Sequence, residues 1–232
     1  MLVGGASAGC VLADRLSRSG RDRVVLLEAG SSDSSPWIHI PLGYGKLFKE
    51  KSVNWMYQTE PEPGLNGRQV FQPRGKVLGG SSSINGLLYV RGQHEDYDRW
   101  RQRGNAGWGY DDVLPYFRKA EDQQRGSDKY HGAGGPLPVS DWRHHDPLSE
   151  AFVHAAAEVG IPTNPDFNGA TQEGAGFFQK HGVFLGKTVW FEVPRQRARK
   201  GAALDLRRPA RMARFALLAV IPSVLLTAII GV

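Results

Sequence analysis

Glycine residues cluster near the start of the chain at a spacing that lets a phosphate group approach the backbone. The sequence from Val3 to Gly9 reads V-G-G-A-S-A-G. In a dinucleotide-binding turn, the first glycine makes the tight turn, the second admits the pyrophosphate, and the third lets the helix pack on the strand. Gly4 and Gly9 occupy the first and third places. Ala6 occupies the second, where its methyl group would crowd a pyrophosphate unless Gly5 relaxes the turn.

An acidic residue follows this turn at the distance that a dinucleotide site requires. Glu28 lies 19 residues beyond Gly9, directly after the apolar run from Val24 to Leu27. A carboxylate at the end of the second strand of such a unit binds a ribose 2′-hydroxyl. The turn and the acid together predict a bound dinucleotide, but they leave open whether it is FAD or NAD.

A second run of small residues distinguishes between these cofactors. Residues 74–98 read R-G-K-V-L-G-G-S-S-S-I-N-G-L-L-Y-V-R-G-Q-H-E-D-Y-D. The glycines and serines of residues 79–83 let backbone N–H groups approach a ligand. From Gly75 to Asp98 the run resembles the first signature of the glucose–methanol–choline (GMC) flavoenzymes. This resemblance implies FAD as the cofactor.

Shorter phrases extend the resemblance over about residues 2–179, where it is closest to the choline-dehydrogenase-like members. These phrases are N-W-x-Y-x-T-x-P from Asn54, G-W-G-Y from Gly107, H-G-x-x-G-P-L from His131, and the stretch 146–179. The resemblance implies an FAD domain interleaved with a substrate domain on an antiparallel sheet. It also implies an FAD-dependent oxidoreductase that acts on the CH–OH group of a small-molecule alcohol.

The resemblance further implies which residues bind the cofactor. At the pyrophosphate and the adenosine ribose it places Gly4, Ala6, Gly9 and Glu28. Backbone N–H groups reach the cofactor from Gly79, Gly80 and Ser81. Along the flavin it places Val77, Asn85, Gly86, Leu87 and Leu88. Some members attach FAD covalently through a histidine just before this asparagine, but Ile84 stands there, so non-covalent FAD is implied.

The residues that would carry out the chemistry have no counterpart in this chain. The second family signature is missing, and so is the C-terminal histidine that takes the alcohol proton with its His or Asn partner. Hydride transfer from an alcohol leaves a proton that a general base must remove. The seven histidines lack metal-ligand spacing, and the pair His144–His145 predicts a solvated loop. We therefore assign no catalytic residue and no metal site.

The elements that position these residues indicate an α/β protein with a Rossmann-like start. We expect a strand at Leu2–Val3, cut to about half its length, a helix over 7–18, and a buried strand over 24–27. Prolines break up residues 31–75. Helices are expected over 97–103, over 110–121 with Asp111 or Asp112 as the cap, and after Asp146. The last of these should pack through Leu148, Phe152, Ala155 and Ala156 and end at Gly160.

Four segments follow from this pattern. Residues 1–134 form the truncated FAD-binding portion, and 135–180 begin an α+β substrate domain. Residues 181–214 are a basic linker, and 215–232 are 18 uncharged residues that predict a hydrophobic helix of membrane-spanning length. The tail has three interpretations: a frame-shifted or fused sequence, a membrane anchor, or a soluble hydrophobic helix. As an anchor, its preceding arginines would put the protein on the cytoplasmic face of an inner membrane; otherwise it is cytoplasmic.

The net charge of +6 belongs to the tail and not to the main body. Residues 1–180 hold 20 Lys and Arg against 21 Asp and Glu, whereas 181–232 hold nine against two. This distribution argues against a nucleic-acid partner. Two functions remain open: the cofactor-binding part of an FAD-dependent alcohol oxidoreductase, or a non-catalytic, membrane-tethered chain with at most residual FAD binding.

Overall fold

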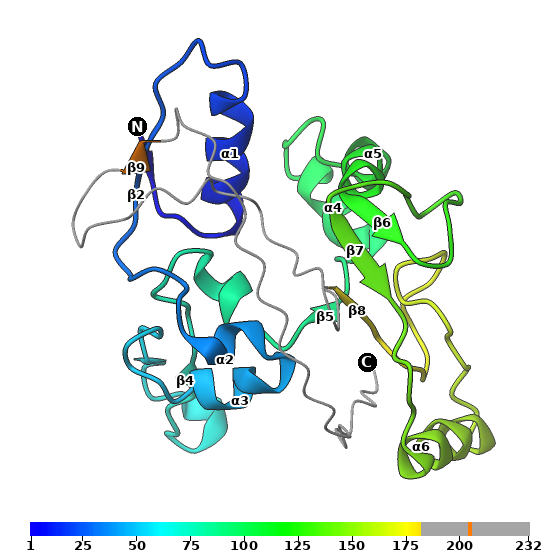
Figure 1. Ribbon diagram of the computed structural model, residues 1–232. Coiled ribbons are helices and arrows are strands. Elements are labelled where there is room, and N and C mark those ends of the chain that lie inside the picture. Colours follow the sequence, from blue (N-terminus) through cyan, green and yellow to red (C-terminus); the bar gives the residue numbers. More distant parts are fainter. Residues whose placement is uncertain (182–203, 206–232) are drawn as a thin grey trace. The chain divides into compact units, whose positions relative to one another are not determined.

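The computed structural model describes residues 1–181 and the backbone of 204–205, and it divides into two compact units (Figure 1). The first unit comprises Met1–Gly86 and the short strand at 204–205, and the second comprises residues 87–181. The predicted functional boundary between residues 134 and 135 falls inside the second unit and stays a prediction. The predicted linker 181–214 and helix 215–232 lie almost wholly outside the described residues.

The first unit begins with the predicted strand–helix–strand arrangement. Strand β1 (Leu2–Val3) pairs in parallel with β2 (Val25–Leu27), and helix α1 (Ser7–Ser17) connects them. Strand β9 (Leu204–Asp205) pairs antiparallel with the other edge of β2. Ala13 of the helix packs with Val24 and Leu26, so the apolar spacing of the sequence forms the expected core.

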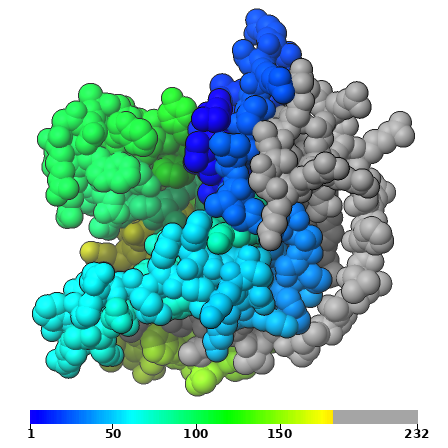
Figure 2. Space-filling model, turned by 90° about the vertical axis from the view of Figure 1, so that its left-hand side faces the viewer, coloured from blue at the N-terminus to red at the C-terminus, as the bar shows by residue number. Residues whose placement is uncertain are grey.

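The rest of the first unit consists of short elements, as the prolines predict. The elements are α2 (Pro36–His39), α3 (Tyr44–Leu47), β3 (Tyr57–Gln58), β4 (Phe71–Gln72) and the 3₁₀ turns η1 (Pro41–Gly43), η2 (Pro63–Leu65) and η3 (Gly80–Ser83). Leu47, Val53, Val77 and Ile84 form a second apolar cluster under them. In the space-filling view these blue to cyan segments form one continuous surface (Figure 2).

The second unit is a four-stranded mixed sheet with three helices (Figure 1). Its elements are β5 (Leu88–Tyr89), α4 (His94–Gln102), α5 (Tyr110–Ala120), β6 (Glu121–Gln123), β7 (Leu137–Ser140), α6 (Pro147–Glu158) and β8 (Gln179–His181). The strand order is β5-β8-β7-β6, and only β6 and β7 run parallel. None of the helices within residues 1–181 is long and apolar enough to cross a membrane.

Two details of the predicted helices α4 and α5 were wrong, each for a local reason. Helix α4 begins at His94 and not at Tyr97, because Gln93 and Asp96 form a capping box ahead of it. The N-cap residue of α5 is Gly109 and not Asp111 or Asp112. Instead, the carboxylate of Asp112 reaches back to the N–H of Gly109 at 2.9 Å.

Helix α6 has the predicted cap but a different buried face. Asp146 accepts the N–H of Leu148 at 2.9 Å, and the chain leaves the helix through Gly160 at φ +88°. The buried side is formed by Ser149, Val153 and Ala156. Leu148, Phe152 and Ala155 are exposed, so the prediction of the packing face was wrong for these three residues and right for Ala156 alone.

Gly9 provides a direct test of how tightly the first turn is packed. A Cβ at this position would lie 1.9 Å from the carbonyl oxygen of Gly4. We expect Gly9→Ala to destabilise the protein by about 1–3 kcal/mol, although alanine has the higher helix propensity. The control is Gly45→Ala, since Gly45 is helical with no atom within 4 Å of the added Cβ. Urea denaturation followed by circular dichroism measures both, and a fully stable Gly9→Ala variant would contradict this packing.

Candidate functional site

The two glycine-rich segments lie side by side in the first unit, as two segments predicted to bind one cofactor should. The N–H of Gly79 donates to the carbonyl of Gly5 at 2.7 Å, and Ala6 and Gly79 form a parallel β-bridge. The N–H of Leu78, the residue before Gly79, donates to the carbonyl of Ser31 at 2.9 Å. The turn at residues 4–9 and the loop at residues 79–83 therefore form one continuous backbone surface.

This surface requires glycine at several points because backbone meets backbone there. A Cβ on Gly30 would lie 2.1 Å from the carbonyl carbon of Lys76, and one on Gly75 would lie 2.1 Å from the carbonyl oxygen of Gly80. Gly80 has φ +57°, and a Cβ there would lie 2.6 Å from the Cβ of Ala6. The Ala6 methyl group thus faces the position where Gly80 lacks a side chain.

Ala6 is compatible with the backbone of the turn. Its φ of −80° and ψ of −170° are extended values that any residue adopts. The glycine expected at this place is therefore not needed for the conformation of the chain. Its absence affects only the space left for a ligand.

Glu28 holds the glycine turn with its carboxylate. The N–H of Gly5 donates to Oε2 at 2.6 Å, and the N–H of Gly30 donates to Oε1 at 2.8 Å. A carboxylate can accept about four hydrogen bonds, so these two leave capacity for a ligand hydroxyl. The sequence predicts Glu28 as a ribose ligand, but its bonds to the turn were missed.

The N-terminus of α1 suits an anionic group. The helix begins without a side-chain cap and without an acidic residue in its first turn. Unpaired N–H groups and the helix dipole favour a phosphate at such an end. The thiol of Cys10 is buried and donates to the Gly5 carbonyl at 3.1 Å, so it links the first turn of α1 to the glycine turn. The uncapped helix, the glycine cradle and Glu28 together fit a dinucleotide.

The serines of the second segment fix its own shape. The hydroxyl of Ser82 donates to the Gly79 carbonyl at 2.6 Å, and that of Ser83 donates to Leu78 at 2.8 Å. The hydroxyl of Ser81 accepts the N–H of Gly75 at 3.1 Å. These bonds hold the loop against residues 75–79.

The residues predicted to line a flavin fall into different environments. Val77 is fully buried in the apolar cluster, and its carbonyl accepts the N–H of Gly80 at 2.7 Å. Asn85 and Gly86 are half-buried at the end of the first unit. Leu87 and Leu88 begin the second unit. Leu87 has φ +66°, a strained value for a leucine, and its carbonyl accepts the N–H of His181 at 2.9 Å.

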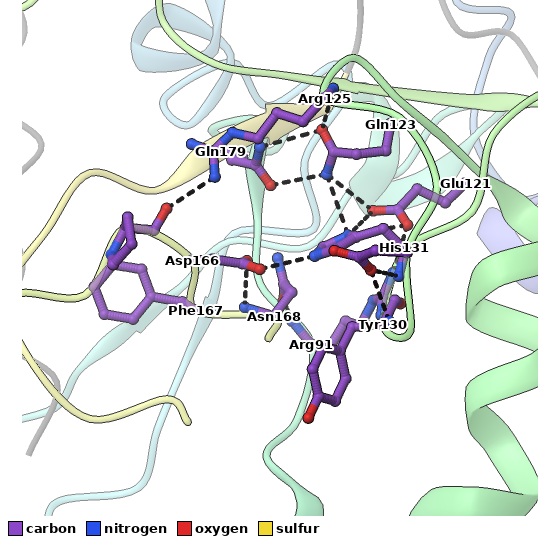
Figure 3. A network of polar contacts seen from close by, with 12 residues as sticks. Arg91, Glu121, Gln123, Arg125, Tyr130, His131, Asp166, Phe167, Asn168 and Gln179 are labelled. Atoms are coloured by element: carbon purple, nitrogen blue, oxygen red, sulfur yellow. Dashed lines mark hydrogen bonds and ion pairs between the residues drawn. The ribbon is translucent and has the colours of Figure 1, made fainter. Parts of the chain in front are cut away.

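The second unit contains a buried polar network that sequence reasoning missed (Figure 3). His131 lies between two carboxylates, with Nδ1 3.0 Å from Oε1 of Glu121 and Nε2 2.8 Å from Oδ2 of Asp166. Arg91 donates to Oε2 of Glu121 at 2.8 Å. The side chains of Arg91, Glu121 and His131 are at most 5% exposed. The cluster therefore depends on its own internal charge balance.

The charges of this network shift the pKa values of its members. Hydrogen bonds to Asp166 and to Glu121 raise the pKa of His131 from 6.5 to about 9. Burial tends to raise the pKa of Asp166, but the hydrogen bonds from His131 and Asn168 leave it below its ordinary value. His131 is therefore an imidazolium at neutral pH, with both ring nitrogens donating.

The network was missed because its members lie far apart in the sequence. His131 is 10 residues from Glu121 and 35 residues from Asp166. The only sequence signal was the phrase H-G-x-x-G-P-L that begins at His131. Within residues 1–181, no group of three or more His, Cys, Asp or Glu side chains could hold a metal ion.

Two of the known proteins that are similar in sequence are dehydrogenases. An alcohol dehydrogenase [acceptor] of Pseudomonas putida is 52% identical over 186 residues, which cover 78% of this chain and 34% of that protein. An oxygen-dependent choline dehydrogenase of Rhizobium etli is 45% identical over 187 residues, covering 81% and 34%. The chain thus spans about a third of the length of these relatives.

Solved structures give the same result for the fold. Pyridoxine 4-oxidase from Mesorbium loti matches with a TM-score of 0.72 and 38% identity, covering 77% of this chain and 35% of that one. Formate oxidase from Aspergillus oryzae matches with a TM-score of 0.68 and 29% identity, covering 77% and 33%. Residues 1–192 also match the sequence profile described as GMC oxidoreductase. The chain, an α/β protein, belongs to the GMC oxidoreductase family.

Proposed function

We propose that this chain binds FAD and is the cofactor-binding part of an oxidoreductase that acts on the CH–OH group of a small alcohol. The main support is the contact between Gly79 and Gly5, which joins two glycine-rich segments beside the uncapped start of α1. FAD, when bound, supplies the group that accepts hydride from the alcohol. The names of the alcohol and choline dehydrogenases among the relatives support this substrate class.

The roles of the residues follow from their geometry and their family positions. The backbone N–H groups at the start of α1, after Gly4 and Ala6, bind the pyrophosphate, with Gly9 giving the close packing. Glu28 binds the adenosine ribose. Residues 79–81 approach the cofactor with their backbone, and residues 85–88 line the flavin. The apolar side chain of Ile84, 2% exposed, has no nucleophile for a covalent bond, which supports non-covalent FAD.

Alcohol oxidation needs a general base, and we assign none in this chain. His131 is unsuited to the role, because it is 4% exposed and both ring nitrogens contact carboxylates. The substrate-facing base belongs, by family resemblance, to a region beyond the match. Membrane association through residues 215–232 and the cytoplasmic location stay predictions from the sequence.

The first test is titration of the flavin-free protein with FAD, followed by flavin fluorescence. We expect saturable binding, and we expect acid precipitation to release all of the flavin if the binding is non-covalent. Glu28→Gln should weaken binding about tenfold, equivalent to about 1.4 kcal/mol, because it loses the charge and one strong acceptor. The exposed Glu60→Gln is the matched control and should bind as the wild type does.

The same preparation tests the absence of a base. With FAD and an artificial electron acceptor present, we expect no turnover of choline or simple alcohols, since loss of a positioned base costs ~10²–10⁴ in rate. Absence of FAD binding would contradict the proposal and favour the non-catalytic alternative. Turnover at a rate usual for such enzymes would contradict the assignment of the base to another region.

A further inference from the structure

The buried network of the second unit is connected to the backbone that follows the flavin-lining residues. The Oδ1 atom of Asp166 accepts the N–H of Asn168 at 3.0 Å. The side chain of Asn168 in turn accepts the N–H of Arg91 at 2.8 Å and donates to the carbonyl of Tyr89 at 3.0 Å. One route of contacts thus runs from His131 through Asp166 and Asn168 to residues 89–91.

A second route of hydrogen bonds reaches strand β5 through the neighbouring strand β8. The amide nitrogen of Gln123 donates to Oε1 of Gln179 at 3.0 Å, and Gln179 donates back at 3.2 Å. Gln179 belongs to β8, where it lies opposite Tyr89 of β5. Two residues further along β8, the N–H of His181 donates to the carbonyl of Leu87. Both routes therefore end on residues 87–91.

The geometry requires that His131 carries two protons. Both oxygens of Glu121 lie within 3.2 Å of Nδ1, and Oδ2 of Asp166 lies 2.8 Å from Nε2. Gln123 Nε2 also lies 3.2 Å from Nδ1, but an amide nitrogen can only donate, and it has Gln179 and Glu121 as acceptors. Only an imidazolium donates from both ring nitrogens, so that Glu121 and Asp166 each accept a hydrogen bond from His131.

The charges around His131 balance only in this state. Arg91 and His131 are positive, while Glu121 and Asp166 are negative. Other charged groups are near the cluster: Arg118 donates to the His131 carbonyl, Asp128 accepts the His131 N–H, and Arg125 and Asp141 form an ion pair beside Gln179. Removal of the proton would leave one uncompensated negative charge among buried groups, which is strongly unfavourable.

We propose that His131, as an imidazolium between Glu121 and Asp166, positions residues 87–91 and so holds Leu87, one of the residues proposed to line the flavin, in its strained backbone conformation. This inference rests on the proposed function for the part that concerns the flavin. His131 is a positioning residue, because its contacts to residues 87–91 run through Asp166, Asn168 and Gln179. The surrounding hydrogen bonds supply the constraint that a leucine at φ +66° needs.

The proton on His131 makes this positioning depend on pH. The pKa of about 9 in the folded protein exceeds the value near 6.5 expected for an unfolded chain. The contribution of the imidazolium is therefore complete below about pH 6.5 and is lost as the pH rises through about 9. Flavin binding that depends on residues 87–91 should weaken over the same range.

The first experiment is NMR on the full chain with ¹⁵N-labelled histidine and no cofactor. We expect both ring nitrogens of His131 to be protonated at pH 7.5 and to titrate near pH 9. Amide hydrogen exchange at Arg91 and His181 should become about tenfold faster in His131→Gln, while exchange at Ile161, in a hydrogen bond to Ala156, stays unchanged. The exposed His154→Gln is the control variant and should leave all three amides unchanged.

A second variant covers the case in which His131→Gln does not fold. Asp166→Asn removes one of the two carboxylates and should lower the pH at which His131 loses its proton. A neutral His131 at pH 7.5, or unchanged exchange at Arg91 and His181 in the folded His131→Gln variant, would overturn the proposal.

The flavin part is tested by FAD titration from pH 6 to pH 10. We expect the affinity of the wild type and of His154→Gln to fall as His131 deprotonates, and that of His131→Gln to be weaker and flat near pH 9. An affinity that does not follow the His131 titration would overturn this part. If the wild type binds no FAD at any pH, the proposed function fails, and the exchange measurement alone decides whether His131 positions residues 87–91.

Discussion

The candidate cofactor site depends on one close approach between two backbone segments. The hydrogen bond from Gly79 to Gly5 brings the loop at residues 79–83 against the turn that begins α1. Added side chains would clash around this contact, because a Cβ on Gly9, Gly30 or Gly80 would lie within 2.6 Å of a neighbouring atom. The N–H groups of Gly5, Gly79 and Gly80 donate within this contact, so the donors for a phosphate come from the uncapped first turn of α1 beside it. Glu28 adds a carboxylate, and its bonds to Gly5 and Gly30 fix the turn.

The second unit is held together by a different kind of interaction. Its sheet is short, and the space between β6, β8 and the loop at residues 164–168 is filled by hydrogen-bonded polar groups (Figure 3). A buried ionic cluster adds little net stability compared with apolar packing, but loss of one member is costly. Such a cluster fixes one arrangement of the backbone and tolerates few others. That property is useful directly after residues 85–88, which we propose to line the flavin.

The sequence alone predicted those features of the fold that depend on residues close together in the chain. The glycine spacing predicted the turn, the apolar periodicity predicted α1 and β2, and Asp146 predicted the start of α6. The juxtaposition of the two glycine segments was also predictable, because both were expected to contact one cofactor. These features depend on neighbouring residues or on a ligand whose chemistry is known.

The features that were missed depend on contacts across the fold. His131 looked like a scattered histidine, because its partners are brought to it by strands and loops that the sequence does not pair. The buried face of α6 was wrong at Leu148, Phe152 and Ala155, since periodicity shows where apolar residues lie on a helix but not what packs on them. The bond of Glu28 to Gly5 was missed because a ribose ligand needs no such bond to be recognised in the sequence.

The central claim is that the backbone surface formed by the two glycine segments binds FAD. The most direct measurement is NMR of the protein with ¹⁵N-labelled glycine during FAD titration. We expect one set of amide resonances to shift together and to saturate at one FAD concentration: those of Gly5, Gly9, Gly79 and Gly80. The resonances of Gly126 and Gly160 in the second unit should not shift. Saturable FAD binding that leaves these four first-unit glycines unmoved would contradict the account.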